Sequence, residues 1–133
     1  MPDPALIRFV RDVLGCGCPD EVLQSITVGR GRWVPAIEAE ITRLDVGGRL
    51  LVYVVEPAGA EPLTTVVSGA VAAGLADRER HGFNRFRLVL ATGDPAAIKA
   101  AAREAFEACN LPDERVHLHV VAVEDCPASP GGR

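Results

Sequence analysis

The sequence predicts a single α/β domain over residues 1–133, built on a mixed sheet of four or five strands with an N-terminal helix on one face. Three observations predict this class. Apolar residues at helical spacing open the chain, an alternating pattern around residues 33–44 leads into a turn, and the second half alternates apolar runs with alanine-rich helical stretches. The length is sufficient to bury a core without disulfide bonds.

The N-terminal segment, residues 1–25, is predicted to be helical. Gly15 ends a first helix, because glycine readily adopts the left-handed conformation found at helix ends. A second, short helix follows, with Cys18 as its capping residue and Pro19 at its first position. The first helix carries one apolar stripe for the core, made of Leu6, Phe9, Val10, Val13 and Leu14.

The sheet core is predicted over residues 33–124, and residues 127–133 are predicted to form a flexible tail. Alternation places Ile41 toward the core and Thr42 toward solvent. A hairpin is followed by β-α-β-α-β, an order that predicts parallel strands with right-handed crossovers. The elements expected in order are a strand at 25–28, a loop at 29–32, a strand at 33–44, a turn at 45–48, a strand at 50–55, a helix at 61–81, a strand at 86–91, a helix at 95–109 and a strand at 116–123.

Composition excludes several classes of partner. The net charge of −4 gives no broad basic surface for nucleic acid, and no apolar run approaches the roughly 18–20 residues that cross a bilayer. The N-terminus lacks the layout of a secretory signal, so a cytoplasmic location is expected. In that reducing compartment the four cysteines are expected to be thiols, ligands or redox groups rather than structural disulfides.

The segment Cys16-Gly17-Cys18-Pro19 is the densest cluster of reactive side chains. Two cysteines separated by one glycine can form a strained, readily reduced disulfide, which is the property of a redox couple. The pair also supplies two of the thiolates of a zinc or iron–sulfur site, with Cys126 as the expected third member. Two further interpretations are a single nucleophilic cysteine with a distant histidine, and a tight turn in which both cysteines are only structural.

Weaker candidates lie in the second half of the chain. His117 and His119 alternate along the last strand, as two metal ligands would. Glu56 and Asp94 follow two central strands, and the carboxyl ends of parallel strands share one sheet edge, where Cys126 is also expected. Asp94 is predicted to cap the following helix through its side chain.

The sequence therefore indicates a small soluble protein with Cys16 and Cys18 as a candidate thiol redox or metal site. The alternative is a non-catalytic binding domain that forms a homo-oligomer, such as a homodimer, through its exposed strand face and a small-residue helix. The pattern does not decide between an enzyme and a binding protein, and it identifies no small-molecule ligand.

Overall fold

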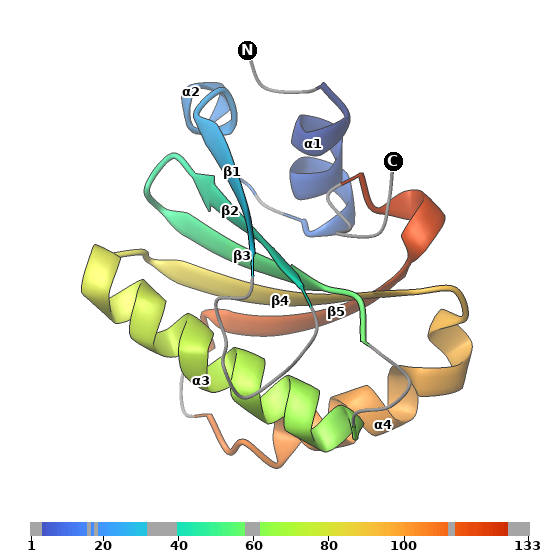
Figure 1. The fold of residues 1–133 in the computed structure, drawn as a ribbon. Helices are drawn as coiled ribbons and strands as arrows, with labels where there is room; N and C mark the ends of the chain where they lie inside the picture. Colours follow the sequence, from blue (N-terminus) through green and yellow to red (C-terminus); the bar gives the residue numbers. More distant parts are fainter. Residues whose placement is uncertain are drawn as a thin grey trace.

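A mixed five-stranded sheet forms the middle layer of the molecule, with helices on both faces (Figure 1). The computed structural model describes residues 4–15, 17, 19–31, 40–57, 62–111 and 114–127. The first three strands form an antiparallel meander, and the third, fourth and fifth are parallel. This arrangement confirms the predicted fold class. In sheet order the strands are β1 (Ile26–Gly31), β2 (Ile41–Val46), β3 (Leu50–Val55), β4 (Arg85–Thr92) and β5 (Val116–Ala122).

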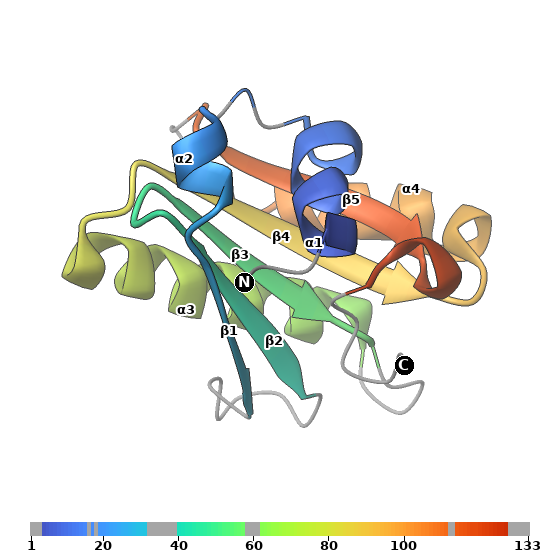
Figure 2. The same cartoon turned by 90° about the horizontal axis from the view of Figure 1, so that it is seen from above.

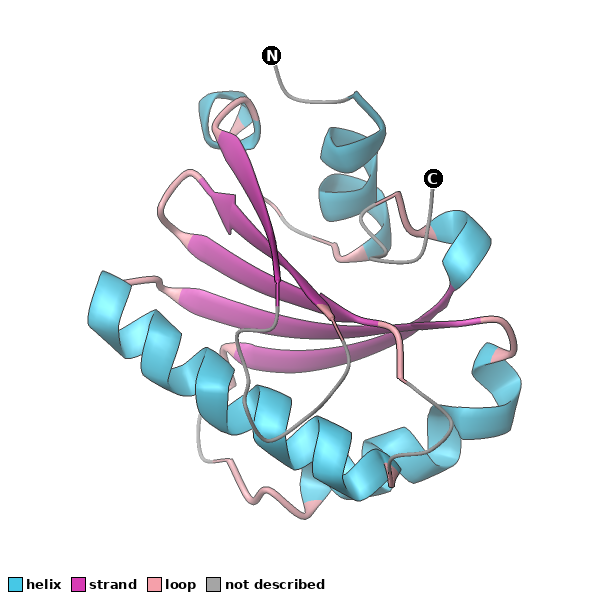
Figure 3. Ribbon diagram, in the orientation of Figure 1, coloured by secondary structure: helices cyan, strands magenta, loops and turns pink. Residues whose placement is uncertain are grey.

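Two long helices, α3 (Leu63–His81) and α4 (Pro95–Glu107), cover one face of the sheet (Figure 3). They are the crossovers between the parallel strands. Gly74 of α3 lies against Phe86 of β4, where an added Cβ would come within 2.1 Å of the phenyl ring. Glycine at this position therefore lets the helix backbone approach the sheet closely. Among the described helices, none has the length and apolar character required to span a membrane.

The other face is covered by the N-terminal segment (Figure 2). It contains α1 (Pro4–Arg8), a π-helical continuation over Phe9–Val13, and α2 (Asp20–Leu23). The predicted end at Gly15 is confirmed by its φ of +69°. This layer and the sheet bury a second apolar cluster, whose members include Leu6, Phe9, Val10, Leu23, Leu44, Val52, Val89, Ala91 and Cys126.

Helix boundaries in this N-terminal layer differ from prediction. The turn before Gly15 closes with a bond from the Leu14 N–H to the Phe9 carbonyl, which is π-helical rather than α-helical spacing. The wider turn rotates Val13 out of the predicted core stripe, and its side chain is 41% exposed. Pro19 is the residue before α2 rather than its first residue, so Cys18 is not the capping residue.

The sheet also begins earlier than residue 33. β1 includes Gly29 to Gly31, which were predicted to be a loop, because pairing with β2 satisfies their backbone groups without any need for side chains. Thr42, predicted to face solvent, is buried because the N-terminal layer covers its side of β2. The predicted strand residues 33–39 lie outside the described residues.

Candidate functional site

Cys16 and Cys18 lie outside the described residues, but their neighbours do not. Gly17 and Pro19 line a pocket beside the first residue of β3 and the beginning of β4. Cys126 is buried beyond the carboxyl end of β5, with 3% of its surface exposed. The described neighbours of the two cysteines and Cys126 are therefore at opposite ends of the parallel strands. The shared site with Cys126 stays a prediction, and this placement lends it no support.

Glu56 and Asp94 follow β3 and β4 at the predicted edge of the sheet. Asp94 precedes α4, but its side chain makes no capping hydrogen bond, so the predicted side-chain cap is wrong. The Ala97 N–H, which such a cap would bind, instead donates to the backbone carbonyl of Asp94 at 3.1 Å. Within the part of the chain that the structure describes, no group of three or more His, Cys, Asp or Glu side chains is arranged to hold a metal ion.

His117 and His119 lie on one face of β5, as predicted, beside arginines of β4. The Nη1 of Arg87 donates to the Nε2 of His119 at 2.9 Å. Because arginine has no acceptor, this nitrogen of His119 must carry its lone pair, and the ring is neutral. Burial, reinforced by the charge of Arg87, lowers the pKa of His119 to about 4. His119 therefore uses this nitrogen to orient a guanidinium rather than to hold a metal.

Arg87 is an unusual residue for the interior of a sheet. Its side chain faces the N-terminal layer from a central strand, and only 7% of the residue surface is exposed. Its Nε is buried and has no hydrogen-bond partner among the residues that the structure describes. Burial, and then the positive charge of Arg85, lowers the pKa of Arg87. Within the described ranges, no acidic side chain forms an ion pair with Arg87.

Two further arginines surround this buried one. Arg85 lies two residues earlier on the same face of β4, and Arg49 ends the turn that leads into β3. The Arg49 carbonyl accepts the N–H groups of Asn84 and Arg85, at 2.8 and 3.1 Å, which fixes the two segments together. The resulting cavity of about 200 Å³, here called the arginine pocket, is lined by Gly17, Pro19, Arg49, Leu50, Asn84, Arg85 and Arg87.

The positive charges of this region form no ion pairs with the acidic side chains that the structure describes. Burial first, and then Arg87 and Arg85, lowers the pKa of His117, so its environment disfavours a further positive charge. Among the described side chains, neither Arg49 nor Arg85 forms an ion pair. The net charge of the chain is −4, so this cluster is a positively charged patch on a negatively charged protein. Such a cluster is suited to hold an anion.

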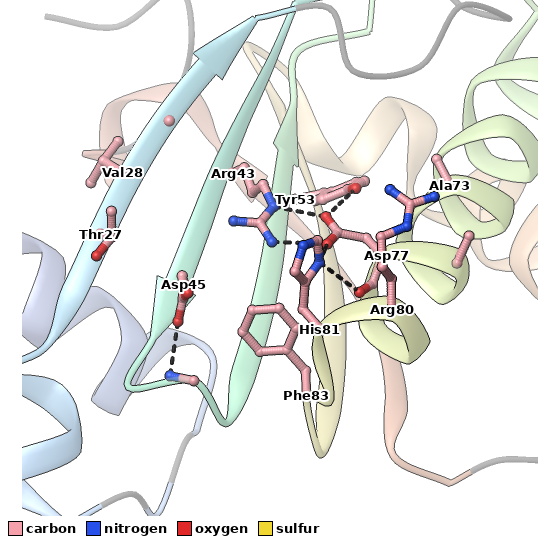
Figure 4. Close-up of a pocket in the computed structure, with 13 residues that line it drawn as sticks. Thr27, Val28, Arg43, Asp45, Tyr53, Ala73, Asp77, Arg80, His81 and Phe83 are labelled. Carbon is pink, nitrogen blue, oxygen red and sulfur yellow. Dashed lines mark hydrogen bonds and ion pairs between the residues drawn. The ribbon is translucent and has the colours of Figure 1, made fainter.

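A second polar cluster lies on the opposite face, in a groove of about 700 Å³ between β1, β2 and α3 (Figure 4). Its centre is the carboxylate of Asp77. Arg43 donates to both carboxylate oxygens, at 2.7 and 2.8 Å. The Tyr53 hydroxyl and the His81 Nδ1 each donate at 2.7 Å.

The Asp77 cluster has the properties of a structural clamp. Burial acts to raise the pKa of Asp77, but hydrogen bonds from Arg43, Tyr53 and His81 outweigh it and hold that pKa well below its ordinary value. Burial and the bond to Asp77 raise the pKa of Tyr53. Each oxygen of Asp77 accepts two hydrogen bonds, so this carboxylate is poorly suited to accept a proton from a ligand. The cluster ties α3 to β2 and β3.

Comparisons with protein-family models, with curated proteins and with solved structures found no match for this chain. A function must therefore be inferred from the chemistry of its own side chains. The arginine pocket is the stronger candidate, because Arg87 is buried with no counterion among the described residues, whereas each carboxylate oxygen of Asp77 accepts two hydrogen bonds. The predicted homo-oligomer stays a prediction.

Sequence reasoning missed both clusters. One pattern in the sequence does indicate the arginine pocket. In the segment Arg85-Phe86-Arg87-Leu88, charged residues alternate with apolar ones inside a strand predicted to be central. A charged residue on a buried face must be paired or must bind something. The Asp77 cluster had a weaker signal, the spacing of Asp77 and His81 on one helix face.

Proposed function

We propose that this protein binds a small oxyanion in the arginine pocket. The observation that carries the proposal is Arg87, a guanidinium buried beside two other arginines, with no described partner for its Nε and no described carboxylate partner. Burying an isolated charge costs several kcal/mol, so an anion that neutralises it gains a strong, charge-assisted interaction. The cavity is smaller than the roughly 300–1,000 Å³ of sites for drug-sized ligands, which favours a small ion or the anionic end of a larger molecule.

The first prediction concerns sulfate binding at low ionic strength. Isothermal titration calorimetry should show saturable binding of about one sulfate ion per chain. Arg87→Met should weaken this binding at least tenfold, because truncating one partner of a buried charged interaction costs roughly 2–5 kcal/mol. Arg103→Met is the matched control, since it removes one positive charge from an exposed position on α4.

Two outcomes would contradict the proposal. One is the absence of saturable sulfate binding in the wild-type protein at concentrations up to tens of millimolar. The other is equal affinity in the wild type and in Arg87→Met, which would assign any binding to another part of the surface.

A second candidate function is a thiol redox or metal site at Cys16 and Cys18. It is favoured by Gly17, the residue between them, which lines the arginine pocket. Neighbouring arginines stabilise thiolates, the form that attacks disulfides and binds metals. In this proposal the pair forms a reversible disulfide or holds zinc or an iron–sulfur cluster.

The second prediction tests this candidate on protein purified without oxygen. We expect either bound zinc or iron by elemental analysis, or the loss of two free thiols after mild oxidation. The double variant Cys16→Ser/Cys18→Ser should abolish that result, whereas Cys109→Ser should retain it. A metal-free protein that keeps four free thiols after mild oxidation would exclude both forms of the candidate.

A further inference from the structure

The polar side chains that line the arginine pocket are almost all hydrogen-bond donors. Arg49, Arg85 and Arg87 have no acceptor atoms. Among the described lining residues, Asn84 contributes the one side-chain oxygen, and that oxygen already accepts a bond from the Nη1 of Arg115 at 3.1 Å. These described residues include no carboxylate and no hydroxyl group.

Three backbone carbonyls near the pocket, those of Arg49, Asn84 and Pro19, also accept hydrogen bonds. The Arg49 carbonyl accepts two N–H groups, and the Asn84 carbonyl accepts the Nη2 of Arg78 at 2.8 Å. The Pro19 carbonyl accepts the N–H groups of Val22 and Leu23, at 3.0 and 3.2 Å. Leu50, Arg85 and Arg87 belong to strands within the ladder. Gly17 adds backbone groups to the lining, and its two neighbours lie outside the described residues.

The imidazole beside the pocket provides no acceptor through its Nε2 either. The lone pair of the His119 Nε2 is taken by Arg87. Among the described groups, a ligand in the arginine pocket therefore meets donors from Arg49, Arg85 and Arg87 and few acceptors to which it can donate. Such a site fits an oxygen that carries a lone pair and no proton.

We propose that the arginine pocket selects an oxyanion that has no proton of its own, namely a sulfate, a sulfonate or a fully ionised phosphate ester, over inorganic phosphate. The inference rests on the proposed anion binding and adds the class of ligand to it. At pH 8 inorganic phosphate is mainly HPO₄²⁻, whose P–OH group needs an acceptor. Burying that donor without one costs about as much as a lost hydrogen bond, which corresponds to roughly a tenfold loss of affinity.

The third prediction compares three ions of equal charge at pH 8. Sulfate, methyl phosphate and inorganic phosphate are then all close to dianionic, and they differ in whether a proton remains on an oxygen. Calorimetric titration should give dissociation constants for sulfate and methyl phosphate that are roughly tenfold lower than for inorganic phosphate. A lower constant for sulfate than for methyl phosphate would identify the ligand group as a sulfate or sulfonate, and the reverse order would identify it as a phosphate ester.

A matched pair of variants tests the cause of the selectivity. Arg49 is exposed, so its replacement leaves the core intact. Arg49→Gln and Arg49→Met remove the same charge and should both weaken sulfate binding. Only glutamine adds an acceptor oxygen, so Arg49→Gln should bring the phosphate-to-sulfate ratio of dissociation constants toward one, while Arg49→Met should leave it near the wild-type value.

The possible failures are distinguishable. If all three ions bind the wild type with equal affinity, the selectivity is wrong and the proposed anion binding stands. If the two Arg49 variants change the ratio equally, the acceptor-poor lining is not its cause and the inference is overturned. If none of the three ions binds, the proposed function itself fails.

Discussion

Replacing Asp77 with asparagine is expected to lower the free energy of unfolding by about 3 kcal/mol at pH 7. The substitution keeps the size of the side chain, so no cavity forms. It removes the negative charge to which two nitrogens of Arg43, the Tyr53 hydroxyl and the His81 ring donate hydrogen bonds. It also places an NH₂ group, itself a donor, against some of those donors. Breaking a largely buried charged cluster leaves its partners without compensation, and this penalty dominates the loss.

The same variant should show a distinctive dependence on pH. The pKa of Asp77 is lower in the folded protein than its ordinary value of 3.8. The unfolded chain therefore takes up the proton first as pH falls, and the stability that the charged group contributes above pH 4 is lost below it. The gap between the wild type and Asp77→Asn should shrink by about 1 kcal/mol between pH 7 and pH 3. Urea denaturation of both proteins at pH 7 and pH 3 measures this difference in the free energy of unfolding.

Two control variants make this result specific. Tyr53→Phe removes one of the hydrogen bonds and should cost about 1 kcal/mol. Asp94→Asn removes an exposed carboxylate that makes no side-chain cap, and should change stability by less than about 0.5 kcal/mol. A loss below 1 kcal/mol for Asp77→Asn at pH 7, or a gap that does not shrink in acid, would show that the cluster is not a clamp.

Arg87→Met is expected to have the opposite sign, and to raise the free energy of unfolding by about 2 kcal/mol in a buffer free of multivalent anions. Methionine fills a similar volume without a charge that must leave water. The buried Nε of Arg87 has no partner among the described residues, so its removal also relieves an unpaired donor, which offsets the hydrogen bond that the His119 Nε2 loses. A residue that lowers the stability of the ligand-free protein is expected at a binding site, because the bound ligand supplies the interactions that the residue lacks.

Sulfate should remove most of this difference. An ion that binds only the folded state at 100 times its dissociation constant adds about 2.7 kcal/mol to the wild type, and about 1.4 kcal/mol to a variant that binds it tenfold more weakly. Thermal denaturation with and without sulfate would measure both effects, with sodium chloride at matched ionic strength as the control. A variant less stable than the wild type in chloride alone would mean that Arg87 is a structural residue, kept for contacts such as its hydrogen bond to His119 rather than for a ligand.

Local sequence patterns were sufficient to predict the sheet and its order of helices. The apolar run that forms β3 and the glycines at turns can be recognised from adjacent residues alone. The structure has both features where they were predicted. Burial of a residue by a segment distant in the chain was harder to predict. Thr42 alternates like a solvent-facing residue, and it is buried only because a segment more than 15 residues away folds over it.

The candidate sites depend on such long-range contacts even more strongly. Arg43 and Asp77 are 34 residues apart in the chain, and Arg87 and His119 are 32 apart. Alternation within β4 shows that Arg85 and Arg87 share a face, but not that Arg49 and the Gly17 turn complete a pocket around them. Reactive residue types are the features visible in the sequence alone, and they pointed to the cysteines instead.

The order of strands across the sheet has a consequence for how the protein forms. Each strand pairs with the strand that precedes it in the chain, from β1 to β5, so the sheet can grow by successive additions as the chain emerges from the ribosome. The N-terminal layer is the exception. Its apolar side chains pack in one cluster with Val89 and Ala91 of β4, so the segment synthesised first completes its packing only after β4 has formed.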